Sequence, residues 1–269
     1  MLSVFLLLCK MHDLSRYLEL STIFERIKQV FVKLLKYLPS EYQAPLNHEN
    51  TRTAFKGIKL KKVRLICPFA EDFTSGQKTR GFYRRGFPEG AVIHYTAGTG
   101  SLQNAAHYAS NKGYNYFIID KSGKIAQLAP LNRWGYHAGK SSCYLGEDVS
   151  QFLVGIEVIC AGRLIVETAP ENGEDVYKTW WGYAVPKENV VEKDNKVFEK
   201  FTQQQVASLS KLIIWLKKEN PDVFEIRNVF GHEEVSPGRK EDPGPSLCTP
   251  MHLYRVELNV LVQMLDKKD

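Results

Sequence analysis

The sequence lacks the marks of disulfide-framed, membrane-spanning and collagen-like chains. Its 269 residues include only five cysteines, which are scattered and form no CxxC pair, so neither a disulfide framework nor a thiolate zinc finger is expected. No apolar run approaches the ~20 residues that a transmembrane helix needs. With 43% hydrophobic and 25% charged residues, the composition is typical of a globular chain, long enough for one large domain with an appendage.

Most of the chain has no net charge, and the positive charge lies at its N-terminal end. Residues 1–62 hold 11 Lys and Arg against 5 Asp and Glu, whereas residues 63–269 hold 25 of each sign. A nucleic-acid partner is therefore not expected, because it would require a basic face on the folded domain. We expect a basic N-terminal extension over residues 1–62 and the main domain over residues 63–269.

The extension carries two patterns. Residues 2–9 are apolar but short, and no Lys or Arg precedes them, so a secretory signal is not convincing. Residues 14–38 have apolar side chains at helical spacing with lysines among them. They predict an amphipathic helix, which either lies on an anionic membrane as a peripheral contact or packs on a protein surface. Residues 39–62 are typical of a linker.

The main domain alternates apolar strand patterns with helix patterns, which predicts an α/β class with a mixed sheet. We expect strands over residues 91–95, 116–120, 125–130, 154–160 and 226–232, and helices over 101–111, 202–220 and 249–267. Thr202 and Gln205 form a capping-box pattern. Residues 163–201 are expected to be irregular, and residues 233–248 a Gly- and Pro-rich loop.

Three potential metal ligands lie at or near predicted strand ends. His94 lies in the first strand, His232 ends a later one, and Asp242 follows ten residues on. Two imidazoles and a carboxylate suit a catalytic zinc, whose fourth position is left for water. A single strand histidine is more often structural, so the hypothesis depends on all three residues together.

Four segments occur together in one order: GAVIHYTAG (90–98), GYHAGKSS (135–142), VGIEV (154–158) and GHEEVSPGRKEDPGP (231–245). In that order they resemble the zinc-dependent N-acetylmuramoyl-L-alanine amidases, a family that includes AmpD-type enzymes, phage-lysozyme amidases and peptidoglycan recognition proteins. The resemblance covers about residues 88–265. It implies a central mixed β-sheet flanked by helices, a zinc-floored groove, and hydrolysis of the bond between muramic acid and L-alanine in peptidoglycan or muropeptides.

By this resemblance, His94, His232 and Asp242 are the Zn²⁺ ligands. The third ligand is similar to that of the AmpD-type branch and differs from the Cys of other branches. Non-catalytic peptidoglycan-binding recognition modules usually lose the third ligand, so the complete set favours an enzyme over that alternative.

Two further residues match positions that carry catalytic roles in the family. Glu157 is similar to a catalytic glutamate and is expected to act as general base and acid; the alternative is a glutamate on the solvent face of an edge strand. Lys240 matches the lysine of the family's PGRK-x-D loop and is expected to stabilise an oxyanion; the alternative is a solvated loop lysine.

Four residues are expected to contact the substrate. His137 is similar to the histidine of the family's WHAG segment, which lines the groove. Tyr136 stands where that segment has Trp, and Trp134 lies two residues earlier. Tyr116 is our choice for a family Tyr or His near the zinc, and Arg239 is expected to meet a substrate carboxylate.

Two questions stay open at this level. Trp180, Trp181 and Tyr183 fall in the irregular stretch, where they either stack on glycans or pack on one another. For the cellular setting, we expect the cell envelope or a secreted, lytic role in preference to the cytoplasm.

Overall fold

The computed structural model describes residues 63–114, 116–168 and 173–266. Contacts divide the chain into two compact units, Asn50–Asn259 and a second made of Met1–Glu49 with Val260–Asp269. Of the second unit, the structure describes the end of one helix. The predicted helix over 14–38 and the linker over 39–62 lie outside the described residues. Among the helices that are described, none is long and apolar enough to cross a membrane.

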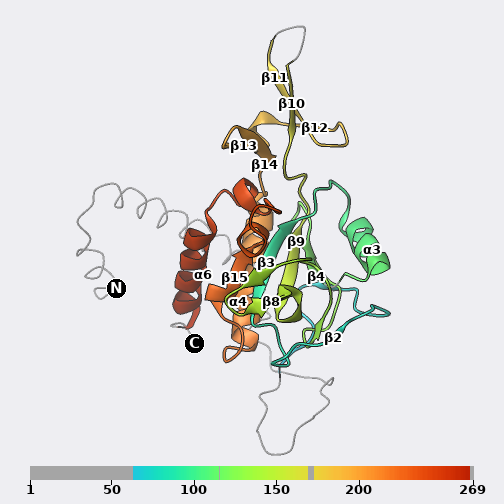
Figure 1. Ribbon diagram of the computed structural model, residues 1–269, viewed down its shortest axis with the longest axis vertical. Helices are drawn as coiled ribbons and strands as arrows, with labels where there is room; N and C mark the ends of the chain where they lie inside the picture. Colours follow the sequence, from blue (N-terminus) through green and yellow to red (C-terminus); the bar gives the residue numbers. More distant parts are fainter. Residues whose placement is uncertain (1–62, 115, 169–172, 267–269) are drawn as a thin grey trace, which may run out of the picture. The chain divides into compact units, whose positions relative to one another are not determined.

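A six-stranded mixed sheet forms the centre of the larger unit (Figure 1). Its order is β1-β5-β4-β9-β3-β15. The strands are β1 (Glu71–Asp72), β3 (Gly90–Tyr95), β4 (Tyr116–Ile119), β5 (Ile125–Gln127), β9 (Leu153–Val158) and β15 (Val229–Gly231). Strands β4, β9, β3 and β15 are parallel neighbours, while β4 and β5 form an antiparallel hairpin. The predicted mixed sheet is confirmed.

Helix α3 (Leu102–Lys112) covers one face of this sheet. Ser101 caps its start by accepting from the Asn104 N–H, and Gly113 ends it in the left-handed conformation at φ +70°. Buried residues of α3 pack against Tyr116 and Ile118 of β4. Side chains alternate between the faces of a strand, and Ile118 is level with Glu157 of β9, so α3 lies on the face that carries Glu157.

Helix α4 (Gln203–Glu219) also packs against the sheet. The predicted capping box is present, with Thr202 accepting from the Gln205 N–H and the Gln205 side chain accepting from the Thr202 N–H. The same Gln205 amide donates to the backbone carbonyl of Ile159 at 2.8 Å, which anchors the start of α4 beside the end of β9. The last helix, α6 (Met251–Asp266), begins close to its predicted start.

The prediction that residues 163–201 are irregular was wrong. They hold a three-stranded antiparallel sheet of β10 (Ile165–Thr168), β11 (Asp175–Lys178) and β12 (Ala184–Val185), followed by the hairpin of β13 (Val190–Lys193) and β14 (Lys196–Glu199). These strands are short and carry charged residues, so the alternation of apolar and polar residues that indicates a β-strand is not visible in the sequence. A small cluster of Ala161, Leu164, Tyr177 and Val185, with Val190 and Val197 packed against it, supplies this insertion with a core of its own.

The strand expected over 226–232 is also shorter than predicted. Residues Ile226–Asn228 form a 3-10 turn, β15 has three residues, and His232 begins the short helix α5 (His232–Val235). The expected loop over 233–248 contains part of α5 and a 3-10 turn at Gly244–Leu247. The remaining short elements are β2 (Gly81–Phe82), β6 (Arg133–Trp134), β7 (Ser142–Cys143), β8 (Gly146–Glu147) and 3-10 turns at Val149–Gln151 and Lys187–Asn189.

Candidate metal centre

The carboxyl ends of the parallel strands bring the candidate residues to one edge of the sheet. His94 near the end of β3 is paired in register with Glu157 of β9. Gly231, the last residue of β15, is level with Ile93 of β3, so His232 follows beside His94. Ligands of open α/β sheets bind at this edge of the strands.

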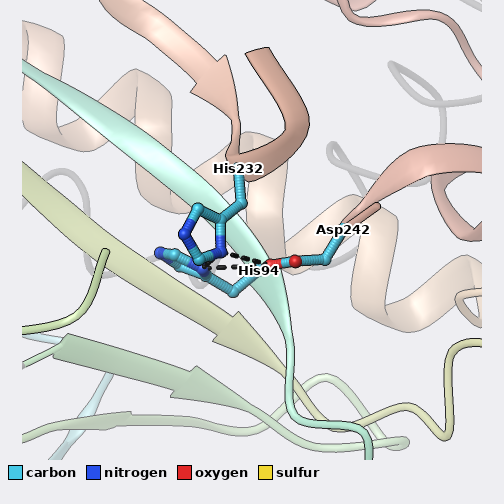
Figure 2. A group of neighbouring side chains, drawn as sticks. All are labelled: His94, His232 and Asp242. Carbon is cyan, nitrogen blue, oxygen red and sulfur yellow. Dashed lines mark hydrogen bonds and ion pairs between the residues drawn. The ribbon is translucent and has the colours of Figure 1, made fainter. Parts of the chain in front are cut away.

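His94, His232 and Asp242 converge there and are all buried. Figure 2 shows both imidazole Nδ1 atoms and the carboxylate directed to one point. The two Nδ1 atoms lie 2.9 Å apart, and Asp242 Oδ2 lies 3.1 Å from that of His94 and 2.9 Å from that of His232. Burial lowers the pKa of His94. Burial also acts to raise the pKa of Asp242, but the two imidazoles beside its carboxylate outweigh it and hold that pKa below its usual range.

The hydrogen bonds behind His94 fix which of its nitrogens faces the centre. His137 Nε2 lies 2.9 Å from the carbonyl of Leu153, and His137 Nδ1 lies 3.1 Å from His94 Nε2. A carbonyl only accepts, so His137 donates through Nε2 and accepts from His94 through Nδ1. The lone pair of His94 is then on Nδ1, toward the centre.

His232 is fixed in the same way. Its Nε2 donates to the carbonyl of Ala138 at 2.9 Å, so its lone pair is also on Nδ1. Three lone-pair atoms, one of them on an anion, therefore face one another with no proton to share. A cation bound between these three atoms would remove the repulsion among their lone pairs. In a four-coordinate zinc site with bonds of ~2.0–2.1 Å, ligand atoms are roughly 3.3 Å apart, close to the distances found here, so the residues fit zinc.

His137 occupies a position that differs from the groove wall implied by the resemblance. Its ring is partly buried behind His94, and both of its nitrogens bind protein atoms. A Cβ added at Gly155 would lie 2.8 Å from the ring, so the glycine of VGIEV is needed for this packing. Burial lowers the pKa of His137 to about 3, which keeps the ring neutral and able to accept from His94.

Glu157 lies next to His94 on the central strand β9, so it is not on an edge strand. Its Oε2 is buried and has no hydrogen-bond partner among the described residues. Burial, and then the charge of Asp242, raise the pKa of Glu157 to about 8, while the charge of Lys240 acts to lower it. A partly buried carboxylate with an unpartnered oxygen is costly for folding, and beside a candidate metal centre it is typical of a proton-transfer group.

Arg239 and Lys240 lie on the exposed loop that carries Asp242. Arg239 Nη2 donates to the carbonyls of Ala138 and Lys140 at 2.6 and 2.7 Å, which joins this loop to the GYHAG segment. Lys240 is exposed, and its charge influences both Glu157 and His94. The expected substrate contact of Arg239 and the oxyanion role of Lys240 stay predictions.

Tyr116 and Trp134 belong to an aromatic group on the same side of the molecule as His137. Tyr116 is buried in β4, and its ring stacks on that of Tyr114. The backbones of Tyr114 and Tyr136 pair in an isolated β-bridge, and the ring of Trp134 contacts that of Tyr136 edge to face. Ile118, two residues after Tyr116 in β4, is level with Glu157, so Tyr116 lies on the same face of the sheet as the candidate base. Burial first, and then the charge of Glu157, raise the pKa of Tyr116. Substrate binding by Tyr116 and Trp134 stays a prediction.

The support of His232 could not be foreseen from the motifs. Glu234 accepts from the N–H of Gly231 at 2.9 Å, and Arg255 of α6 binds Glu234 through two hydrogen bonds of 2.8 and 2.9 Å. Arg255 also donates to the carbonyl of Val229. This bidentate pair holds the start of α5 against β15 and so positions His232. Only the Gly155 contact had a signal in the sequence, because glycine within a buried strand often marks a close approach.

The chain thus combines a mixed α/β sheet with a candidate His, His, Asp metal site at its carboxyl edge, and this donor set is typical of catalytic zinc sites. The family model described as N-acetylmuramoyl-L-alanine amidase matches residues 84–245, which include all three candidate ligands. The chain belongs to this family.

The curated relatives carry one name. The chain is 27% identical over 127 residues to the 1,6-anhydro-N-acetylmuramyl-L-alanine amidase AmpD of Haemophilus influenzae, covering 47% of this chain and 50% of that protein. It is 24% identical over 153 residues to the AmpD of Escherichia coli, covering 55% and 63%. The matched regions thus span about half to three fifths of these relatives.

Solved structures are similar in part. A selenomethionine AmpD derivative aligns with a TM-score of 0.46 at 19% identity, covering 74% of this chain and 99% of that one. The Escherichia coli amidase AmiD, in complex with the substrate anhydro-N-acetylmuramic acid-L-Ala-D-gamma-Glu-L-Lys, aligns with a TM-score of 0.44 at 20% identity, covering 64% and 58%.

Proposed function

We propose that this protein is a zinc-dependent N-acetylmuramoyl-L-alanine amidase, which hydrolyses the amide between N-acetylmuramic acid and L-alanine in peptidoglycan or muropeptides. The observation that carries the proposal is the convergence of three lone-pair ligand atoms beside the unpartnered carboxylate of Glu157. Family membership and the activity for which the AmpD relatives are named support the substrate.

His94, His232 and Asp242 would hold the zinc. When bound, zinc supplies Lewis-acid polarisation and favours ionisation of water. Glu157 takes the proton from the water whose oxygen attacks the scissile carbonyl carbon. It then returns this proton to the leaving nitrogen as the carbon–nitrogen bond breaks. Products are the muramic acid carboxylate and a free L-alanine amine.

Lys240 is suited to stabilise the negative oxygen that develops on the attacked carbonyl. It lies two residues before Asp242, and its charge acts on Glu157. A cation directed at developing charge stabilises the transition state more than the bound substrate. Because Lys240 belongs to the loop that Arg239 ties to Lys140, its backbone is held in place before substrate binds.

The rival function is a recognition module that binds peptidoglycan without cutting it. The complete ligand set and the placement of Glu157 disfavour it, because a binding module needs neither. Incubation with purified soluble muropeptides and with sacculi, followed by mass analysis of the products, separates the two. The proposal requires release of free stem peptides with an L-alanine amine; binding without any such release would establish the rival.

A further inference from the structure

The insertion between β9 and α4 exposes three aromatic side chains that the metal centre does not use. Trp180, Trp181 and Tyr183 are 78%, 68% and 63% exposed. They occupy the turn between β11 and β12, and we call this turn with β10–β12 the aromatic arm. The alternative that they pack on one another within the insertion is not what the structure shows, because the small core there is built from other residues.

The turn presents these rings from a fixed backbone. The Thr179 N–H donates to the Tyr183 carbonyl at 2.8 Å, and the Gly182 N–H donates back to the Thr179 carbonyl at 2.9 Å. The Thr179 hydroxyl accepts from the Tyr183 N–H at 3.1 Å, and Thr179 is buried. Gly182 adopts φ +82°, which favours glycine. The aromatic surface is therefore preorganised, which lowers the cost of binding.

The insertion is tied to the loop that carries a metal ligand. The chain enters it directly from β9, and the Leu164 N–H donates to the Val197 carbonyl of β14 at 2.8 Å. Lys196 of β14 forms an ion pair of 2.6 Å with Glu241, the residue before Asp242. The aromatic arm thus emerges from the edge of the sheet where the metal centre lies (Figure 1).

The charge of the arm decides between two partners for such rings. The described residues of the arm, 165–168 and 173–185, contain three acidic residues and one lysine, a net charge of −2. Aromatic side chains that enter a membrane surface are normally accompanied by Lys and Arg, which anionic lipids attract. A sugar ring instead offers an uncharged apolar C–H face to an indole, and its hydroxyls can meet the indole N–H.

We infer that the aromatic arm binds the glycan strand of polymeric peptidoglycan and holds it beside the metal centre. The inference rests on the proposed function and deepens it, because it selects the polymer over small soluble muropeptides as the preferred substrate. Trp180 and Trp181 supply the stacking surface, and neither belongs to the catalytic machinery.

The test compares the Trp180→Ala/Trp181→Ala double variant with the parent chain on two substrates. We expect hydrolysis of sacculi at limiting concentration to fall about tenfold or more, the scale of losing central interface aromatics. Hydrolysis of a soluble muropeptide should stay within about twofold. The Trp180→Phe/Trp181→Phe variant keeps two ring faces and should restore most of the sacculus activity. Thermal melting of each variant checks the fold.

A binding measurement keeps this inference distinct from the proposed function. Glu157→Gln protein, with and without the two alanines, is sedimented with sacculi and separately with vesicles of anionic or zwitterionic phospholipid. The alanines should lower sacculus binding about tenfold and leave vesicle binding unchanged. Equal sacculus binding, or a loss confined to vesicles, would overturn the glycan assignment. A parent chain that hydrolyses neither substrate would overturn the amidase proposal, whatever the binding shows.

Discussion

The metal centre and the aromatic arm expose their rings in opposite ways. His94 and His232 are 2% and 3% exposed, whereas Trp180 and Trp181 are 78% and 68% exposed. In both regions hydrogen bonds hold the geometry in advance: carbonyls of Leu153 and Ala138 orient the histidine network, and Thr179 closes the turn of the arm. The comparison separates a buried arrangement, to which we assign chemistry, from an exposed one, to which we assign contact with the substrate.

Metal removal should have the largest effect of the changes considered. It should abolish activity at the metal centre and leave the aromatic arm unchanged. We expect exhaustive chelation to abolish amidase activity and zinc to restore it, since three ligand atoms face one another without a shared proton. Metal analysis should find one zinc per chain in the parent and none in Asp242→Ala. The arm should be unaffected, so chelated protein should still sediment with sacculi.

Two results would contradict the prediction for metal removal. Full activity in protein shown by metal analysis to be free of zinc would remove the ligand assignment of His94, His232 and Asp242. Loss of sacculus binding on chelation, with the fold intact, would instead show that the two regions act together in binding.

The next largest effect is expected from Glu157→Gln. Glutamine keeps the shape of the side chain but cannot accept a proton, so turnover should fall by about 100-fold or more. Zinc content and sacculus binding should be retained. Single-turnover assays on a soluble muropeptide measure the effect, with Glu147→Gln, an exposed glutamate of β8, as the matched control. A variant with near-normal turnover would make Glu157 structural.

His137→Phe tests the hydrogen-bond chain behind the metal centre. The variant leaves the His94 Nε2–H without its acceptor, and loss of such a partner typically costs about 10- to 100-fold in metal affinity. Competition with a zinc chelator measures this directly, without an activity assay. His107→Phe, on the exposed side of α3, is the control and should bind zinc like the parent. Unchanged zinc affinity in His137→Phe would show that the hydrogen bonds through His137 do not support His94 as a ligand.

A separate effect, on stability and not on activity, concerns the pH dependence of unfolding in zinc-free protein. The folded-state pKa of Glu157, about 8, lies above its ordinary value of 4.5 because the group is buried. The folded state therefore holds the proton more tightly, and stability should fall as pH rises from 4.5 through 8. Glu157→Gln removes this loss, so its advantage should grow over that window, to at most about 5 kcal/mol. Urea unfolding at pH 5 and pH 8.5 measures it; an advantage independent of pH would contradict the assignment.

The sequence predicted the metal centre better than the arm because of where their constraints lie. Ligand residues recur in fixed motifs, and strand patterns around His94 and Glu157 are continuously apolar, as expected for central parallel strands. The strand expected over 226–232 was too long because Ile226 was counted with the apolar Val229 and Phe230. Residues Ile226–Asn228 instead form a 3-10 turn before β15, and such a turn has no separate signal in the sequence.

The arm was missed because its strands are stabilised by few residues. Only Tyr177 and Val185 of β11 and β12 enter its small core, while β10 is exposed along its length. Alternation is weak when so few side chains are buried. The support of His137 by Leu153 was likewise hidden, because a backbone carbonyl leaves no trace in the choice of amino acid.

The smallest catalytic effect is expected from the N-terminal extension. Residues 1–62 carry the whole net charge of +6, whereas the predicted catalytic residues all follow Gly90. We expect a chain without residues 1–62 to hydrolyse soluble muropeptides at nearly the parent rate. Co-sedimentation with anionic vesicles should weaken, most strongly at low salt, where charge attraction is least screened. An insoluble or much less heat-stable truncated chain would show instead that the predicted helix over 14–38 packs on protein. Because the arm is acidic, vesicle binding that survives truncation would also contradict the separation of a basic membrane-facing segment from a glycan-facing one.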